Sequence, residues 1–291
     1  MPNKIQFFKK NLRVTKLLNP YLPQKTKFPQ QMEVGINNGT QFPIQKLDLK
    51  QYNNSRDEIS EKVHDKVNNL VELLHEVFQL YKPNEVMLSF NGGKDCTVVL
   101  HLLHNFYQAN PCLQHIRIPT LYITDPDAFE EVDEFVEECE KLFSIDVIRK
   151  PGPIKKALEE ICIERPHIKA VFMGCRRTDP YCENLKTMQP TDAGWPPLMR
   201  INPILDWRCR DVWQYLYLYK VPYCNLYQKG YTSIGNKKNT VPNPYLRVVD
   251  ETTGAIVSYR PGHELIDNDD LERAGRFKPP KENTNVNSAA K

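Results

Sequence analysis

The stretch SFNGGKDC, residues 89–96, has the most chemically suggestive spacing in the chain, because two glycines, a lysine and an aspartate follow an apolar run and precede a helix-like run. Gly92 and Gly93 can adopt positive φ angles and let a ligand approach the backbone. A helix that starts here would present unpaired N–H groups and the positive end of its dipole. These features predict a site for a phosphate-like anion, or else a plain turn with Asp95 as helix cap. The side chains that can add donors or charge are those of Ser89, Asn91 and Lys94.

This loop differs from the two most familiar nucleotide-binding patterns. In the pattern G-x-x-x-x-G-K-[ST], the first glycine would stand at Leu88 and the hydroxyl residue at Asp95. The dinucleotide fingerprint G-x-G-x-x-G is not matched here either. The loop therefore indicates neither a Walker-type NTPase nor a dinucleotide-binding enzyme.

Two further polar groups follow predicted strands. The DPD stretch at 125–127 comes after the apolar run 118–124, and the GCRRTDP stretch at 174–180 comes after the apolar run 168–173. Ligands of open α/β sheets bind beyond the carboxyl ends of the strands, so both groups are expected near residues 89–96. The DPD stretch is also a common turn sequence, and the two interpretations are equally good.

Apolar residues recur at steps of three and four from Ile59 to Phe78, which predicts a long amphipathic helix behind a capping-box pattern at Ser55. Further along, short apolar runs alternate with helical patterns. Such alternation predicts an α/β fold with a mostly parallel sheet flanked by helices. The predicted strands are 85–90, 118–124, 145–148 and 168–173, and the predicted helices between and after them are 97–106, 130–143 and 154–163.

The chain of 291 residues is expected to contain one such core with additions at both ends. The expected segments are a poorly ordered basic arm over 1–50, a leading amphipathic helix over 51–82, the α/β core over 83–218, and a C-terminal extension with its tail over 219–291. Composition limits the partners. A net charge of +3 gives no reason to expect a nucleic-acid or membrane partner, and no run of about 18 apolar residues is present.

The cysteines and the N-terminal arm bear on the compartment. Eight cysteines occur without a C-x-x-C pair, which predicts reduced and mostly buried thiols rather than a structural zinc site. A cytoplasmic, monomeric protein is expected. Residues 1–32 are basic and carry no acid, so a mitochondrial targeting segment is the alternative. His101 and His104 stand in an apolar run without a partner carboxylate, and Trp213 stands in an aromatic run; all three are expected to be structural.

The loop at 89–96 resembles the pyrophosphate loop of the ATP pyrophosphatase superfamily, S-x-G-G-x-D-S, with Cys96 in place of the final serine and one added residue. Within that superfamily, which includes the PAPS reductases, the chain resembles the eukaryotic FAD synthetases (FMN adenylyltransferases) of fungal type over about residues 85–276. Motifs similar to those of this family follow in order: GCRRTDP at 174–180, TDAGWP at 191–196, RINPILDW at 200–207, VPYC at 221–224, GYTSIG at 230–235 and LERAGR at 271–276.

The resemblance implies an adenine nucleotide alpha hydrolase-like (Rossmann-like) core with a C-terminal flavin-binding extension. It also implies transfer of AMP from ATP to FMN, giving FAD and pyrophosphate, with Mg²⁺ as counterion. The implied ATP-binding residues are Ser89, Asn91, Gly92, Gly93, Lys94, Asp95, Ile123 and Arg176. The implied FMN-binding residues are Asp179, Trp195, Arg273 and Arg276, of which the two arginines are expected to share one helix face. The implied catalytic residues are Asn91, Asp95, Asp179, Arg273 and Arg276, with either Asp95 or Asp179 holding the metal.

Three alternative functions stay open. A sulfonucleotide reductase shares the loop type but needs a redox cysteine near its C-terminus, whereas the last cysteine here is Cys224. A tRNA-thiolating pyrophosphatase usually has paired cysteines and a nucleic-acid-binding face. A non-catalytic flavin-binding protein would bind FMN without consuming ATP, and would not need the phosphate loop.

Overall fold

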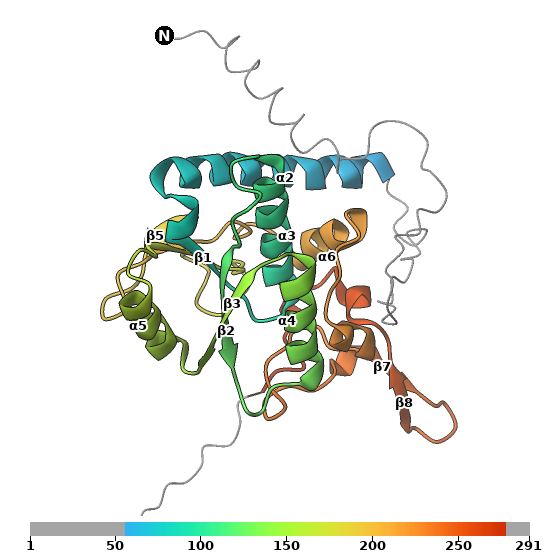
Figure 1. Ribbon diagram of the computed structural model, residues 1–291. Helices are drawn as coiled ribbons and strands as arrows, with labels where there is room; N and C mark the ends of the chain where they lie inside the picture. Colours follow the sequence, from blue (N-terminus) through green and yellow to red (C-terminus); the bar gives the residue numbers. More distant parts are fainter. Residues whose placement is uncertain (1–55, 278–291) are drawn as a thin grey trace, which may run out of the picture.

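The computed structural model describes residues 56–277, with side chains from Lys62 onward, and a six-stranded sheet forms its centre (Figure 1). The strand order is β3-β2-β1-β4-β6-β5, and every neighbouring pair is parallel except β5 with β6. The predicted α/β fold with a mostly parallel sheet is therefore confirmed. The strands are β1 Val86–Ser89, β2 Pro119–Thr124, β3 Asp146–Pro151, β4 Ala170–Phe172, β5 Met188–Pro190 and β6 Met199–Ile201.

Strand β1 lies inside the sheet, between β2 and β4. Leu88 lies opposite Thr120 of β2 on one side and opposite Phe172 of β4 on the other. All three side chains are fully buried. The apolar runs predicted the first four strands, whereas β5 and β6 have three residues each, too few to show any periodicity.

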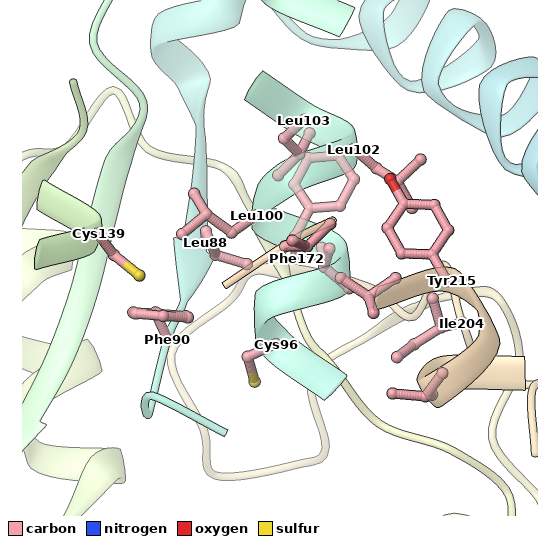
Figure 2. Packing of buried hydrophobic residues seen from close by; sticks show 14 of the residues in the cluster. Leu88, Phe90, Cys96, Leu100, Leu102, Leu103, Cys139, Phe172, Ile204 and Tyr215 are labelled. Carbon is pink, nitrogen blue, oxygen red and sulfur yellow. The ribbon is translucent and has the colours of Figure 1, made fainter. Parts of the chain in front are cut away.

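Helices cover both faces of the sheet, and the alternation of side chains along β1 separates the two cores. Val86 and Leu88 belong to the larger cluster, which includes residues of α2, α3, α4 and α6, whereas Met87 belongs to the smaller cluster under α5. Figure 2 shows the larger cluster, with Leu88 and Phe172 of the sheet beside Leu100 and Leu103 of α3. The helices are α2 Arg56–Leu80, α3 Lys94–Ala109, α4 Glu130–Leu142, α5 Ile154–Glu164 and α6 Cys209–Leu218.

The leading helix α2 buries one face, as its periodicity predicts. Its buried side chains are Val63, Val67, Leu70, Val71, Leu74 and Val77. The helix contacts both α3 and α6 and so completes the outer layer on this face. The capping residue Ser55, the arm over 1–50 and the tail from Lys278 lie outside the described residues.

Between α6 and Phe277 the described chain forms short elements, among them a two-stranded sheet of β7 and β8, and both side-chain and backbone hydrogen bonds join this segment to the core. Figure 1 shows one hairpin, β7–β8, projecting from the body. No helix among residues 56–277 is long and apolar enough to cross a membrane. The short elements are η3 Asn225–Lys229, η4 Pro244–Leu246, β7 Arg247–Val249, β8 Ile256–Tyr259, η5 Gly262–Leu265 and η6 Asp269–Leu271.

All eight cysteines fall within the described residues and all are free thiols, as predicted. Five of them are buried, and only Cys112 is exposed. Burial raises the pKa of the Cys96 thiol to about 12, because an apolar site disfavours the thiolate. The five buried cysteines therefore behave as small apolar side chains of the core.

Candidate active site

The predicted anion loop connects β1 to α3 at the carboxyl edge of the sheet. Gly92 has a φ of +69°, and a Cβ there would approach Val132 Cγ1 to 3.0 Å, so both the backbone and the space favour glycine. Gly93 instead has a φ of −75° and is the N-cap of α3. Its N–H donates to Asn91 Oδ1 at 2.9 Å. Only the first of the two glycines therefore needs the left-handed region.

The alternative in which Asp95 simply caps α3 is wrong. Gly93, which has no side chain, occupies the cap, and the Asp95 carboxylate faces two cations. Asp95 Oδ2 lies 3.0 Å from Lys94 Nζ, and Asp95 Oδ1 lies 2.6 Å from Arg176 Nε. The backbone N–H of Lys94 donates to the hydroxyl of Tyr227 at 2.9 Å. The helix start is thus held by a carboxylate–cation group and by a buried phenol.

Lys94 and Arg176 are both 1% exposed, which is exceptional for charged side chains. Burial opposes the charge of Lys94, but Asp95 and Glu272 outweigh burial and raise the pKa of Lys94 well above its ordinary value. For Arg176, too, burial is outweighed by Asp95 and Glu272, and its pKa is raised. Both groups therefore carry their positive charge beside the loop.

Two further carboxylates come from the C-terminal segment, and the sequence interpretation did not include them. Glu272 accepts from Arg176 Nη2 at 2.7 and 2.6 Å and also from Lys94 Nζ. Asp269 Oδ1 accepts from the backbone N–H of Cys209 at 2.7 Å and lies 3.5 Å from Arg176 Nη1. Glu272 directly precedes one of the predicted arginines in sequence, but nothing in that position indicates burial.

Asp179 lies at the edge of this group. Its Oδ2 accepts from the backbone N–H of Arg176 at 2.9 Å, while its Oδ1 stays 3.9 Å from Arg176 Nη2. Burial, and then the charge of Asp95, raise the pKa of Asp179. The structure therefore brings together four of the predicted residues, namely Lys94, Asp95, Arg176 and Asp179.

Asp179 fits a divalent cation better than its neighbours do. Mg²⁺ prefers hard oxygen ligands, and both oxygens of Asp95 already lie within 3.0 Å of a cation. The carboxylate of Asp179 is less fully paired, and a metal ion beside it would offset the repulsion from Asp95. Cys209, Asp269 and Glu272 also have ligand atoms within 4.8 Å of one another. However, burial raises the pKa of the Cys209 thiol, so that set is poorly suited to Mg²⁺.

The structure corrects the prediction that Arg273 and Arg276 share a helix face. Residues 272–275 form turns, and Arg276 forms an isolated antiparallel bridge with Thr240. The reason lies at Gly275, whose carbonyl accepts from Val241 N and where a Cβ would come within 2.3 Å of Val241 O. The two arginines nevertheless converge, because each donates to Ser233 Oγ, at 3.3 and 3.4 Å.

The end of β2 forms the turn that the DPD stretch allows. Asp125 Oδ1 accepts from Asp127 N at 2.8 Å, and Asp125 Oδ2 accepts from Asn236 Nδ2 at 2.8 Å. The side-chain bond to Asn236 lowers the pKa of Asp125 most. Through the hydrogen bond between Asp125 and Asn236, the turn also joins the end of β2 to the segment that follows Ser233. Ile123, half-buried, precedes this turn.

The aromatic residues separate into two groups. Trp213 is buried against Tyr217, Tyr223 and Tyr227, as expected of a core side chain. Trp195, in contrast, is 38% exposed.

The two histidines of α3 have structural partners, as expected. His101 Nδ1 lies 2.7 Å from Tyr215 OH, and burial lowers the pKa of His101 to about 3. His104 Nδ1 donates to the carbonyl of Phe143 at 3.2 Å. Both rings therefore belong to the packing between α3 and its neighbours.

Comparison with known proteins agrees with this fold and loop. The family model of the phosphoadenosine phosphosulfate reductase domain matches residues 85–150 and 143–242. A probable FAD synthase of Schizosaccharomyces pombe is 37% identical over 210 residues, which cover 71% of this chain and 77% of the relative. The flavin adenine dinucleotide synthase of Saccharomyces cerevisiae is 31% identical, over 71% of this chain and 87% of the relative. The chain therefore contains a phosphoadenosine phosphosulfate reductase domain and belongs to the FAD synthase family.

Solved structures give the same result. Candida glabrata FMN adenylyltransferase in complex with FMN and the ATP analogue AMPCPP aligns with a TM-score of 0.70 at 30% identity, covering 77% of this chain and 93% of that one. Yeast FAD synthetase in complex with FAD aligns with a TM-score of 0.69 at 27% identity, covering 92% and 99%. The chain spans only 40% of the probable FAD synthase of Caenorhabditis elegans, to which it is 39% identical.

Proposed function

We propose that this chain transfers the AMP group of ATP to FMN and releases pyrophosphate. The observation that carries the proposal is the meeting of the β1–α3 loop with Arg176 and Asp179 at the carboxyl edge of the sheet. Supporting it, relatives at 31 to 37% identity are FAD synthases, and a similar structure holds FMN with an ATP analogue. The chain is accordingly a nucleotidyltransferase.

In the proposed reaction, an oxygen of the FMN phosphate attacks the α-phosphorus of ATP. The bond between that phosphorus and the α,β-bridging oxygen breaks, and its electron pair leaves with pyrophosphate. A phosphate monoester has its second pKa near 6, so the attacking group is mostly dianionic at neutral pH and needs no general base. The work of the protein is to align two anions and to offset their charge.

On the ATP side, we assign the leaving pyrophosphate to the start of α3. The loop residues Ser89, Asn91, Gly92 and Gly93 supply donors, and the dipole of α3 favours negative charge there. Lys94 and Arg176 supply two buried positive charges behind this loop. We assign the adenine to the end of β2 beside Ile123. Mg²⁺, when bound, supplies charge neutralisation for the phosphates, and Asp179 is the residue we assign to it.

On the flavin side, we assign FMN to the segment that carries Arg273 and Arg276. Both guanidinium groups point at Ser233, and two adjacent cations repel, which favours an anion between them. Burial lowers the pKa of Arg276 first, and the charge of Arg273 adds to this effect. A flavin phosphate would relieve that repulsion. Trp195, whose side chain is exposed, remains a proposed flavin contact.

We further propose that the protein acts as a monomer in the cytoplasm. Free thiols at all eight cysteines suit a reducing compartment. The mitochondrial alternative rests on residues 1–32, which lie outside the described part of the chain.

The direct test supplies purified protein with FMN, ATP and Mg²⁺, separates the flavins by chromatography and measures pyrophosphate. We expect equal amounts of FAD and pyrophosphate. Asp179→Ala and Arg273→Ala should each lose synthesis by ~10²-fold or more while melting close to the wild-type temperature. Matched controls are Asp206→Ala and Arg260→Ala, because both side chains are exposed and form exposed ion pairs, with Arg177 and Glu264 respectively.

Different results would change the assignment. Release of pyrophosphate without FAD would agree with ATP cleavage of the superfamily type but would indicate that the AMP group goes to an acceptor other than FMN. FMN binding without either product would support a flavin-binding protein that does not consume ATP. Unfolding of Asp179→Ala or Arg273→Ala would mean that a residue assigned to the site is part of the scaffold.

A further inference from the structure

Glu272 has an unusual place between the two halves of the site. It is only 4% exposed, although it is a carboxylate in a segment without regular secondary structure. Its oxygens lie at hydrogen-bond distance from Arg176, which follows β4, and from Lys94, which begins α3. One side chain from the C-terminal segment thus contacts both buried cations on the ATP side.

The positions of those cations depend on such a partner. Removing a partner from a buried charge leaves that charge uncompensated, which is costly. Asp95 cannot replace Glu272, because Asp95 follows Lys94 directly and moves with the same helix start. Asp179 and Asp269 are farther from Arg176, at 3.9 and 3.5 Å. Glu272 is therefore the close carboxylate that joins the cations to a different part of the chain.

Hydrogen bonds from the neighbouring segment hold the backbone around Glu272. The Glu272 carbonyl accepts from Thr232 Oγ1 at 2.6 Å. Asn243 Nδ2 donates both to Thr232 Oγ1 and to the carbonyl of Leu271, each at 2.8 Å. The next residue, Arg273, reaches Ser233 beside Thr232. A shift of the Glu272 carboxylate would thus move the segment that presents the flavin-side arginine.

We infer that Glu272 is a positioning residue that couples the flavin side of the site to the ATP side. Its carboxylate holds Lys94 and Arg176 in place, and its backbone holds Arg273 in place, so order on one side favours order on the other. The inference rests on the proposed function for the identity of the two ligands. It predicts that occupation of the ATP site changes the affinity for FMN, and that this coupling passes through Glu272.

The experiment measures FMN binding by flavin fluorescence, with and without the methylene-bridged analogue AMPCPP and Mg²⁺, in the full chain. The ratio of the two dissociation constants is the coupling factor, and ~5- to 150-fold is typical of coupled sites. We expect a factor in this range for the wild type and a factor within about twofold of one for Glu272→Gln. Asp270→Asn, an equal change of charge at an exposed neighbour, should keep the wild-type factor.

A second variant keeps the test decisive if Glu272→Gln does not fold. Glu272→Asp retains the charge but withdraws it by one methylene, and should also lower the coupling factor. A wild-type factor in either variant would overturn the inference, as would a wild-type protein whose two sites bind independently. These binding measurements need no turnover. A protein that binds neither FMN nor AMPCPP would instead contradict the proposed function.

Discussion

Replacing Arg176 by methionine should destabilise the protein far more than the same change at its neighbour Arg177. The two arginines are adjacent in sequence but differ in surroundings. Arg176 is 1% exposed and contacts Asp95 and Glu272, whereas the side chain of Arg177 is 42% exposed and pairs with Asp206, itself 69% exposed. The pair thus compares a buried and an exposed arginine with the same change of side chain.

The expected magnitudes follow from burial. Arg176→Met leaves Asp95 and Glu272 to share the single charge of Lys94, and breaking a buried pair costs ~3–5 kcal/mol. Arg177→Met breaks an exposed ion pair, for which ~0.2–1 kcal/mol is typical. It also removes exposed hydrogen bonds from Nη1 to the carbonyls of Glu183 and Leu185, which water can replace. For a domain of 150–250 residues, each kcal/mol shifts Tm by roughly 2–4 °C, so we expect a loss of ~6–20 °C for Arg176→Met.

The assay is urea unfolding followed by tryptophan fluorescence, repeated at pH 7 and near pH 3.5. Burial raises the pKa of Asp95, but Arg176 and then Lys94 outweigh burial, so its folded pKa lies below its ordinary value of about 4. Asp95 therefore contributes stability above about pH 4, and this contribution is lost as pH falls through the folded pKa. The difference between wild type and Arg176→Met should shrink on acidification. Equal destabilisation by both substitutions at pH 7 would refute the reasoning.

Two further predictions concern the helix α3 and its loop. Burial lowers the pKa of His101 to about 3, so below about pH 6.5 the unfolded chain binds a proton at this residue that the folded chain does not. His101 should therefore lower the free energy of unfolding by about 1.4 kcal/mol per pH unit from there down toward pH 3, in addition to the contributions of His64, His104 and His263, whose pKa values burial also lowers. His101→Gln should remove this part of the slope in urea unfolding at several pH values, and an unchanged slope would assign it to other groups. Gly92→Ala should cost ~1–2 kcal/mol, because of its φ of +69°, and should weaken AMPCPP binding measured by calorimetry, whereas Gly254→Ala, with similar φ but open space, should leave that binding unchanged.

Local patterns predicted the sheet and the glycine turn between β1 and α3, because both are encoded over short stretches. The apolar runs around Leu88 and Leu121 are long enough to be seen, and Gly92 follows its strand directly. In contrast, β5 and β6 carry no periodic signal. The spacing of Arg273 and Arg276 predicts a helix, because spacing alone cannot show that Gly275 packs against Val241.

The charged partners of the loop could not be predicted for a different reason. Glu272 lies 178 positions from Lys94 and 96 positions from Arg176 along the chain. A glutamate followed by an arginine is most often a solvated pair, and no local property distinguishes a buried glutamate of this kind. Tyr227, which accepts from the start of α3, is equally remote in sequence. A single sequence shows the loop but not what surrounds it.

The distance along the chain between Lys94 and Glu272 also affects the order in which the molecule is made. During synthesis the sheet and its helices emerge first and can fold as a unit, because domains form from the N-terminal side as the chain grows. The Glu272 carboxylate that completes the ion group emerges 178 residues after Lys94, and contacts across such separations close late. A nascent chain that stops before Glu272 would hold the complete six-stranded sheet, with Lys94 and Arg176 lacking one of their carboxylate partners. The ion group around Lys94 and Arg176 is therefore expected to close only after Glu272 has been made.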